Sequence, residues 1–125
     1  MTIDPSIKIC IRPDADSACL EAAERFICDA TASVAKYGAF SAAFSGGNTP
    51  KRMLEYLADP EYSMLVPWRY IVLLQTDERF LPYDHPESNS RMLHEALWKK
   101  VPILDENIHT FPVDLPLDES AKVYN

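Results

Sequence analysis

The sequence has very little glycine and no long hydrophobic run. Its 125 residues include three glycines against ten prolines, although glycine is ordinarily the commoner of the two. No segment approaches the roughly 20 apolar residues that a membrane helix needs. The first residues also have neither the basic start nor the apolar core of a secretion signal. These absences exclude a collagen-like chain and predict a cytoplasmic protein with no membrane contact.

Basic residues are also scarce, because 12 lysines and arginines face 19 acidic residues and give a formal charge of −7. Such a chain has little attraction for nucleic-acid phosphate, so we expect no nucleic-acid partner. Any anionic ligand must be held by a local group of donors. Cys10, Cys19 and Cys28 are odd in number, and a nine-residue spacing puts Cys19 and Cys28 on opposite faces of a helix. They are expected to be reduced structural thiols, with no disulfide or shared metal.

The order of apolar patterns predicts that residues 1–125 belong to a single α/β domain. Strands are expected at residues 7–11, 39–44, 70–74 and 108–111, the second and third of them buried on both faces. Helices are expected from Asp14 to Tyr37, from a Thr49 cap to Ala58, over residues 90–100 and from Asp118 onward. This alternation is typical of an open, mostly parallel, doubly wound sheet of the Rossmann-like kind.

Two loops of this sheet follow predicted strands, and ligands of such folds bind beyond the carboxyl ends of the strands. One loop contains Gly46 and Gly47, which either make a tight turn or let the backbone approach a ligand at the start of a helix. The other contains Asp77 and Arg79. Arg79 offers a charged planar fork suited to phosphate, unless the loop is an ordinary solvated one. Together the loops predict an anion site.

Three blocks of sequence resemble the N-terminal half of the 6-phosphogluconolactonase family. They are Ser45-Gly46-Gly47-Asn48-Thr49-Pro50, Asp77-Glu78-Arg79-Phe80-Leu81-Pro82 and Asp84-His85-Pro86-Glu87-Ser88-Asn89-Ser90-Arg91-Met92. The resemblance covers roughly residues 35–112 and implies a NagB-like fold that is incomplete in this chain, so that residues 1–125 are the N-terminal portion of the domain. The same fold is shared with glucosamine-6-phosphate deaminase. Arg79 and the Ser88-Asn89 pair favour the lactonase, because the deaminase usually has tyrosine at the position of Arg79.

The resemblance implies hydrolysis of 6-phosphogluconolactone in the pentose phosphate route, with no metal or redox cofactor. The implied sugar-phosphate-binding residues are Gly46, Gly47, Asn48, Thr49, Asp77, Arg79 and Arg91. Of these, Arg79 is expected to hold the phosphate, while Asp77 orients Arg79 or a sugar hydroxyl.

The catalytic histidine that the resemblance implies belongs to a Gly-x-Asp-Gly-His segment, which this sequence lacks. His85, His94 and His109 occur in other contexts and are expected to have surface or packing roles. The general base is therefore expected in a second half of the fold, and the chain alone is expected not to hydrolyse the lactone. A deaminase-like isomerase and a non-catalytic sugar-phosphate-binding module remain as alternatives. An uncovered sheet edge further predicts self-association.

Overall fold

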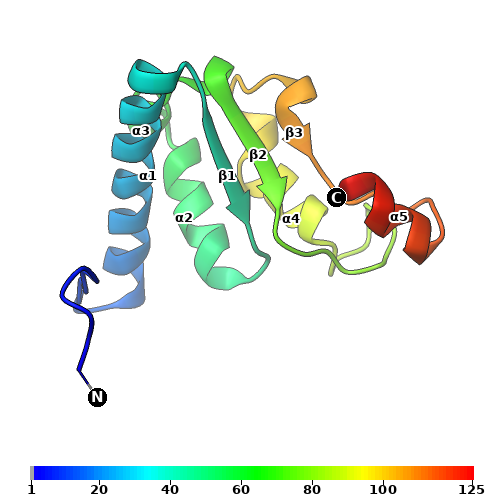
Figure 1. Cartoon of the computed structure of the whole chain (residues 1–125), viewed down its shortest axis with the longest axis horizontal. Helices are drawn as coiled ribbons and strands as arrows, with labels where there is room; N and C mark the ends of the chain where they lie inside the picture. The colour runs from blue at the N-terminus through cyan, green and yellow to red at the C-terminus, as the bar shows by residue number, and fades with distance from the viewer. Residues whose placement is uncertain (1) are drawn as a thin grey trace.

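The computed structural model describes residues 2–125, which form a three-stranded parallel sheet with helices packed against it (Figure 1). The strands are β1 (Phe40–Phe44), β2 (Ile71–Gln75) and β3 (Ile108–His109), in the order β1-β2-β3. Phe40 pairs with Ile71, and Leu73 pairs with Ile108. The open, parallel α/β sheet expected from the sequence is confirmed.

In the described part of the chain, five α-helices accompany the strands: α1 (Ala15–Tyr37), α2 (Asn48–Ala58), α3 (Pro60–Ser63), α4 (Asn89–Ala96) and α5 (Leu117–Tyr124). The first helix follows its sequence signals at both ends. Asp14 caps it by accepting a hydrogen bond from the Ser17 amide at 2.7 Å, and Gly38 ends it in the left-handed region at φ 83°. Glycine adopts that conformation without steric cost, so the predicted end of the helix is confirmed.

The hydrophobic core lies between the sheet and helices α1, α2 and α4. Phe26 of α1 packs edge-on against Phe40, with ring centroids 5.3 Å apart, and also contacts Phe44 and Trp68. Trp68 is buried, and its indole N–H donates to the Ser63 carbonyl at 3.0 Å. The fully buried large side chains are mostly leucines from α2, β2, α4 and the C-cap of α4, together with one isoleucine: Leu54, Leu57, Ile71, Leu73, Leu93 and Leu97.

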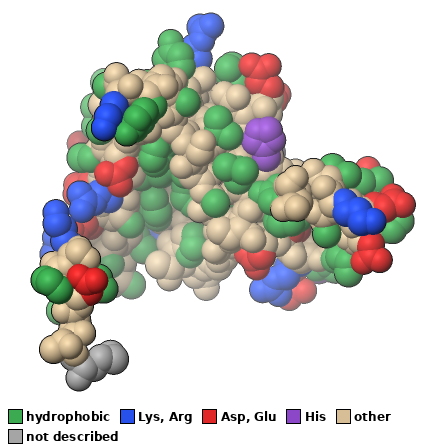
Figure 2. Space-filling view, viewed as in Figure 1, with side chains coloured by type: hydrophobic (Ala, Val, Ile, Leu, Met, Phe, Trp, Pro, Cys, Tyr) green, Lys and Arg blue, Asp and Glu red, His purple; other side chains and the backbone are tan. Residues whose placement is uncertain are grey.

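The other face of the sheet is largely uncovered, contrary to the prediction that residues 39–44 and 70–74 are buried on both faces. In β1, Ser41 and Ala43 are exposed, and in β2, Val72 and Leu74 are half-buried. Among residues 2–125, the end of α5 comes near this face, where Val123 borders the same hollow as Val72 and Leu74. Figure 2 shows hydrophobic side chains on the surface in this view. An apolar run indicates a strand that can be buried, but other residues must supply the layer that covers it. Residues 2–125 supply such a layer on one face of the sheet.

Residues 7–11 do not form the strand that their alternating pattern predicts. This segment is irregular and pairs with no strand within residues 2–125, and Ile7, Ile9 and Ile11 are exposed. In Figure 1 it lies beyond α1, away from the sheet. A strand needs a neighbour for its backbone groups, and residues 2–125 place no strand beside this one.

Self-association stays a prediction, and light scattering tests it: a uniformly monomeric chain would contradict it.

Two helix boundaries differ from those expected. Helix α2 begins at Asn48 instead of after a Thr49 cap, because the positive φ of Gly47 turns the chain one residue earlier. Helix α4 begins at Asn89 with Ser88 as its cap, and its predicted last turn is a 3₁₀ turn at Trp98–Lys100. In residues 2–125, no helix is both long and apolar enough to cross a membrane.

Candidate sugar-phosphate site

The glycine turn joins the carboxyl end of β1 to helix α2 and leaves helix amides unused. Gly47 is the N-cap of α2, and no side chain caps this end. Within residues 2–125, the amides of Asn48 and Thr49 have no hydrogen-bond acceptor, whereas Lys51 donates to the Gly47 carbonyl at 3.2 Å. Free amides and the positive end of the helix dipole favour an anion here. The exposed position of Asn48 and Thr49 leaves this end of the helix open to a ligand.

The turn requires glycine at position 47, as the sequence predicted. Gly47 has φ 112° and ψ 168°, a region in which other residues are strained by about 1–3 kcal/mol. We expect Gly47→Ala to lower the free energy of unfolding by this amount and to weaken sugar-phosphate binding. Gly38→Ala is the matched control, since Gly38 also has positive φ but lies at the far end of α1. Urea melts should show that both variants are less stable than the parent chain. Calorimetry should show weaker binding for Gly47→Ala alone. Equal affinities would contradict a role for the turn in binding.

The second loop places Asp77 and Arg79 together in a cavity of about 280 Å³ at the carboxyl end of β2. The cavity lies between residues 76–80 and helix α5, with Phe111 and Leu117 among its apolar walls. Arg79 forms no ion pair within residues 2–125. Asp77 accepts a hydrogen bond from the Thr76 hydroxyl at 3.1 Å. The guanidinium of Arg79 is thus available for an anion. Asp77 and Arg79 form no ion pair with each other within residues 2–125, and the role of Asp77 in orienting Arg79 or a sugar hydroxyl stays a prediction.

Two contacts connect the glycine turn to this second loop. The hydroxyl oxygens of Ser45 and Thr76 lie 2.8 Å apart. The Asn89 side chain donates to the Asp77 carbonyl at 3.2 Å, and a Cβ on Gly46 would lie only 2.0 Å from its Oδ1. Gly46 is therefore required by the close approach of Asn89. The two loops that the sequence singled out are side by side, and Asn89 lies between them.

Glu78 joins the second loop to the start of helix α4. Its Oε1 accepts hydrogen bonds from the amides of Arg79 at 2.7 Å and Asn89 at 2.6 Å. Its Oε2 accepts from the amide and hydroxyl of Ser90, at 2.8 and 2.6 Å, and from the Gln75 side chain at 3.1 Å. Burial alone raises the pKa of this carboxyl, but the hydrogen bonds from Ser90, Gln75 and Asn89 together hold it below the ordinary 4.5. The group is a carboxylate at neutral pH.

The lowered pKa of Glu78 makes the stability of the chain depend on pH in one direction. A carboxyl with a lowered folded-state pKa stabilises the fold above its unfolded pKa, and this contribution is lost as pH falls through the folded value. We expect Glu78→Gln to lower the Tm by several degrees near pH 7. The difference from the parent should shrink below about pH 4.5. Thermal melts from pH 7 to pH 3 measure this difference in Tm, and the Glu87→Gln variant, at an exposed position, is the control. A difference that stays constant with pH would contradict this assignment.

Helix α5 closes the far side of the second loop. The Tyr124 hydroxyl accepts from the Gln75 amide and donates to the Gln75 carbonyl, both at 2.6 Å, and its ring stacks on Phe111 at 3.7 Å. The buried Gln75 side chain accepts from the Phe111 amide at 2.8 Å. These contacts fix the last residue of β2, from which the loop with Asp77 and Arg79 begins.

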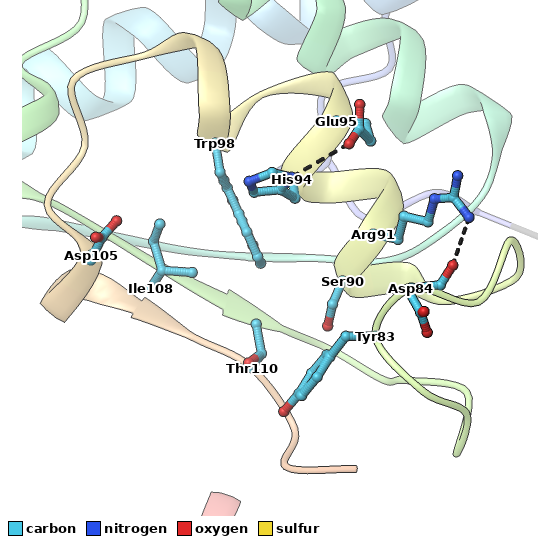
Figure 3. Close-up of a pocket in the computed structure, with 10 residues that line it drawn as sticks. All are labelled: Tyr83, Asp84, Ser90, Arg91, His94, Glu95, Trp98, Asp105, Ile108 and Thr110. Carbon is cyan, nitrogen blue, oxygen red and sulfur yellow. Dashed lines mark hydrogen bonds and ion pairs between the residues drawn. The ribbon is translucent and has the colours of Figure 1, made fainter. Parts of the chain in front are cut away.

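Another cavity lies between α4 and β3 and has a volume of about 690 Å³ (Figure 3). Trp98 and Ile108 form its apolar part, and Arg91 stands at its rim. The guanidinium of Arg91 donates to the Asp84 carbonyl at 2.6 Å. No contact within residues 2–125 brings Arg91 to the glycine turn, so its predicted binding role stays a prediction. Thr49 borders a third cavity, with Cys19 and Met53; this cavity is separate from that of Asp77 and Arg79.

The histidines lie apart from Asp77 and Arg79. His85 accepts from the Glu87 amide in its own loop, His94 borders the cavity of Trp98, and His109 is exposed on β3. Among residues 2–125, none of them lines the cavity that holds Arg79. Arg52, near the glycine turn, pairs with Asp16 at 2.6 Å, which supports a role in joining α1 to α2.

Sequence reasoning missed the residues that hold the loops together, namely Glu78, Asn89 and Gln75. A signal was available in the run Ser88-Asn89-Ser90, which is rich in helix-capping residues and offers free amides to a carboxylate. What the sequence does not show is that this helix start folds back onto residues 76–79.

The chain resembles known proteins over nearly its whole length. The sequence profile described as "Glucosamine-6-phosphate isomerases/6-phosphogluconolactonase" matches residues 13–125. A 6-phosphogluconolactonase from Synechocystis sp. is 42% identical over 82 residues, which are 66% of this chain and 32% of that protein. The chain thus spans about a third of the length of this curated relative.

Solved structures show the same architecture. A 6-phosphogluconolactonase from Trypanosoma cruzi superposes with a TM-score of 0.80 at 25% identity, covering 99% of this chain and 49% of that one. A monomeric glucosamine-6-phosphate deaminase superposes with a TM-score of 0.80 at 14% identity, covering 94% and 48%, which shows the shared fold alone. The chain corresponds to about half of each structure.

Proposed function

The chain belongs to the family of glucosamine-6-phosphate isomerases and 6-phosphogluconolactonases, and on that premise we propose that it forms the sugar-phosphate-binding part of a 6-phosphogluconolactonase. The observation that carries the proposal is the unpaired guanidinium of Arg79 beside Asp77 in one cavity. Charged planar donors of this kind hold phosphate through paired hydrogen bonds. The lactonase relatives support this choice over the deaminase.

In the proposed complex the substrate lies along the carboxyl edge of the sheet. Arg79 binds the phosphate, and Asp77 bonds a sugar hydroxyl or orients Arg79. The free amides of Asn48 and Thr49, together with Gly46 and Gly47, surround the sugar and its lactone carbonyl. Fixing the lactone in this way supplies the positioning part of catalysis.

The reaction itself is hydrolysis of the lactone of 6-phosphogluconate. A base removes a proton from water, the water oxygen bonds to the carbonyl carbon, and the bond from that carbon to the ring oxygen breaks. The ring oxygen leaves as a hydroxyl after it gains a proton. None of the three histidines lines the cavity of Arg79 within residues 2–125, and we propose, as the resemblance implies, that the base comes from a second half of the fold. The chain by itself then binds the sugar phosphate without turning it over.

A stopped-flow assay with freshly made lactone, corrected for spontaneous opening, tests this proposal alongside calorimetry with 6-phosphogluconate. We expect saturable binding and no hydrolysis above the background. Turnover near an ordinary enzyme rate of about 10 s⁻¹ would place the base within this chain. Ammonia release from glucosamine 6-phosphate would favour the deaminase. Absence of binding would overturn the proposal.

A further inference from the structure

Within residues 2–125, the carboxylate of Glu78 is the acceptor in every hydrogen bond that its oxygens form. The amides of Arg79, Asn89 and Ser90 cannot accept a hydrogen bond, and each lies within 2.8 Å of a carboxylate oxygen. The Gln75 side chain presents its amide nitrogen as well. An ionised carboxyl is the acceptor-only group among side chains. If position 78 were glutamine, either orientation of the side chain would direct its NH₂ group at one or more of these backbone N–H groups.

The same carboxylate is connected to both loops of the candidate site. Asp77 and Arg79 flank it in sequence, and the Arg79 amide is bonded to it directly. On its other side it holds the Asn89 amide at 2.6 Å, and the Asn89 side chain in turn bonds the Asp77 carbonyl and covers Gly46. The position of the glycine turn relative to Arg79 therefore depends on one buried cluster.

We propose that Glu78 is the positioning residue of this site, and that its carboxylate sets the glycine turn and Arg79 at the separation that a sugar phosphate spans. The identity of the ligand rests on the proposed function. The positioning role of Glu78 rests on its hydrogen bonds alone. Glu78 is not a catalytic residue, because its oxygens are occupied by protein donors. It acts through Asn89 and Arg79.

The test combines hydrogen exchange without ligand and calorimetry with 6-phosphogluconate on Glu78→Gln. We expect exchange at the hydrogen-bonded amides of the two loops, namely Lys51, Thr76, Arg79 and Asn89, to accelerate about 10-fold or more, because hydrogen bonds to the charged group are lost. The affinity for 6-phosphogluconate should fall by a similar factor. Exchange in α1 should change much less.

Two controls separate positioning from general stability. Glu87→Gln makes the same charge change in the next loop and should leave both readouts unchanged. Ile71→Val weakens the core and should speed exchange evenly, without selecting the two loops. If Glu78→Gln does not fold, Asn89→Ala replaces it with the same expectation, because it removes the bridge and keeps the carboxylate.

The outcomes are distinguishable. Loop exchange in Glu78→Gln that matches Glu87→Gln, or that is no greater than in Ile71→Val, would overturn the positioning role. If the parent chain does not bind 6-phosphogluconate, the proposed function fails, while accelerated exchange of the two loops would still support the role of Glu78.

Discussion

Replacing Arg79 by alanine should weaken the binding of 6-phosphogluconate by roughly 10- to 150-fold, because the loss of a charge-assisted partner of phosphate costs about 1.5–3 kcal/mol. The guanidinium has no ion pair within residues 2–125 and lines the cavity at the end of β2. Stability should change little, since the Arg79 side chain is exposed. Calorimetry at constant ionic strength measures the affinity.

Two further variants sharpen this result. Arg79→Lys keeps the charge but loses the planar fork, so it should recover part of the affinity. Arg91→Ala, whose guanidinium bonds the Asp84 carbonyl instead, measures whether the role predicted for Arg91 exists. Equal affinity for the parent chain and Arg79→Ala would remove Arg79 from the site.

Gly46→Ala should destabilise the chain by about 1–3 kcal/mol, the usual cost of forcing extra atoms into a packed region. The new methyl group would lie 2.0 Å from Asn89 Oδ1 and 2.6 Å from its Cγ. Asn89 is buried and held by the Asp77 carbonyl and Glu78, so it cannot move aside without losing those contacts. Urea denaturation measures the change in the free energy of unfolding.

A double-mutant cycle with Asn89→Ala isolates the contact. If the clash is the cause, Gly46→Ala should cost less in the Asn89→Ala background than in the parent, with a coupling of about 0.5–3 kcal/mol. Costs that simply add would show that Gly46 is required for another reason.

The sequence predicted the elements of this fold better than their surroundings. Asp14 and Gly38 mark the ends of α1 correctly, because capping depends on residues within one turn. The apolar strand around Leu73 was also found. One face of this strand is largely uncovered, and Ile9 lies in an unpaired segment. Both facts depend on which other segments of the chain lie nearby. Local patterns contain no information on that point.

The site shows the same division. Gly46, Gly47 and Arg79 stood out because turn chemistry and a lone charged fork are visible in a few neighbouring residues. Glu78 and Asn89 did not, since their roles arise from a contact between residues eleven positions apart. For Gly46 the structure adds a reason that the sequence did not show, which is the close approach of Asn89.

The central claim is that a sugar phosphate binds where the glycine turn meets Arg79. An amide-resolved NMR titration of the chain with 6-phosphogluconate tests it most directly. The account predicts saturable shifts of the amides of Gly46, Gly47, Asn48 and Arg79, which Arg79→Ala largely abolishes. Shifts confined to the cavity around Trp98, or no saturable shifts at all, would contradict it.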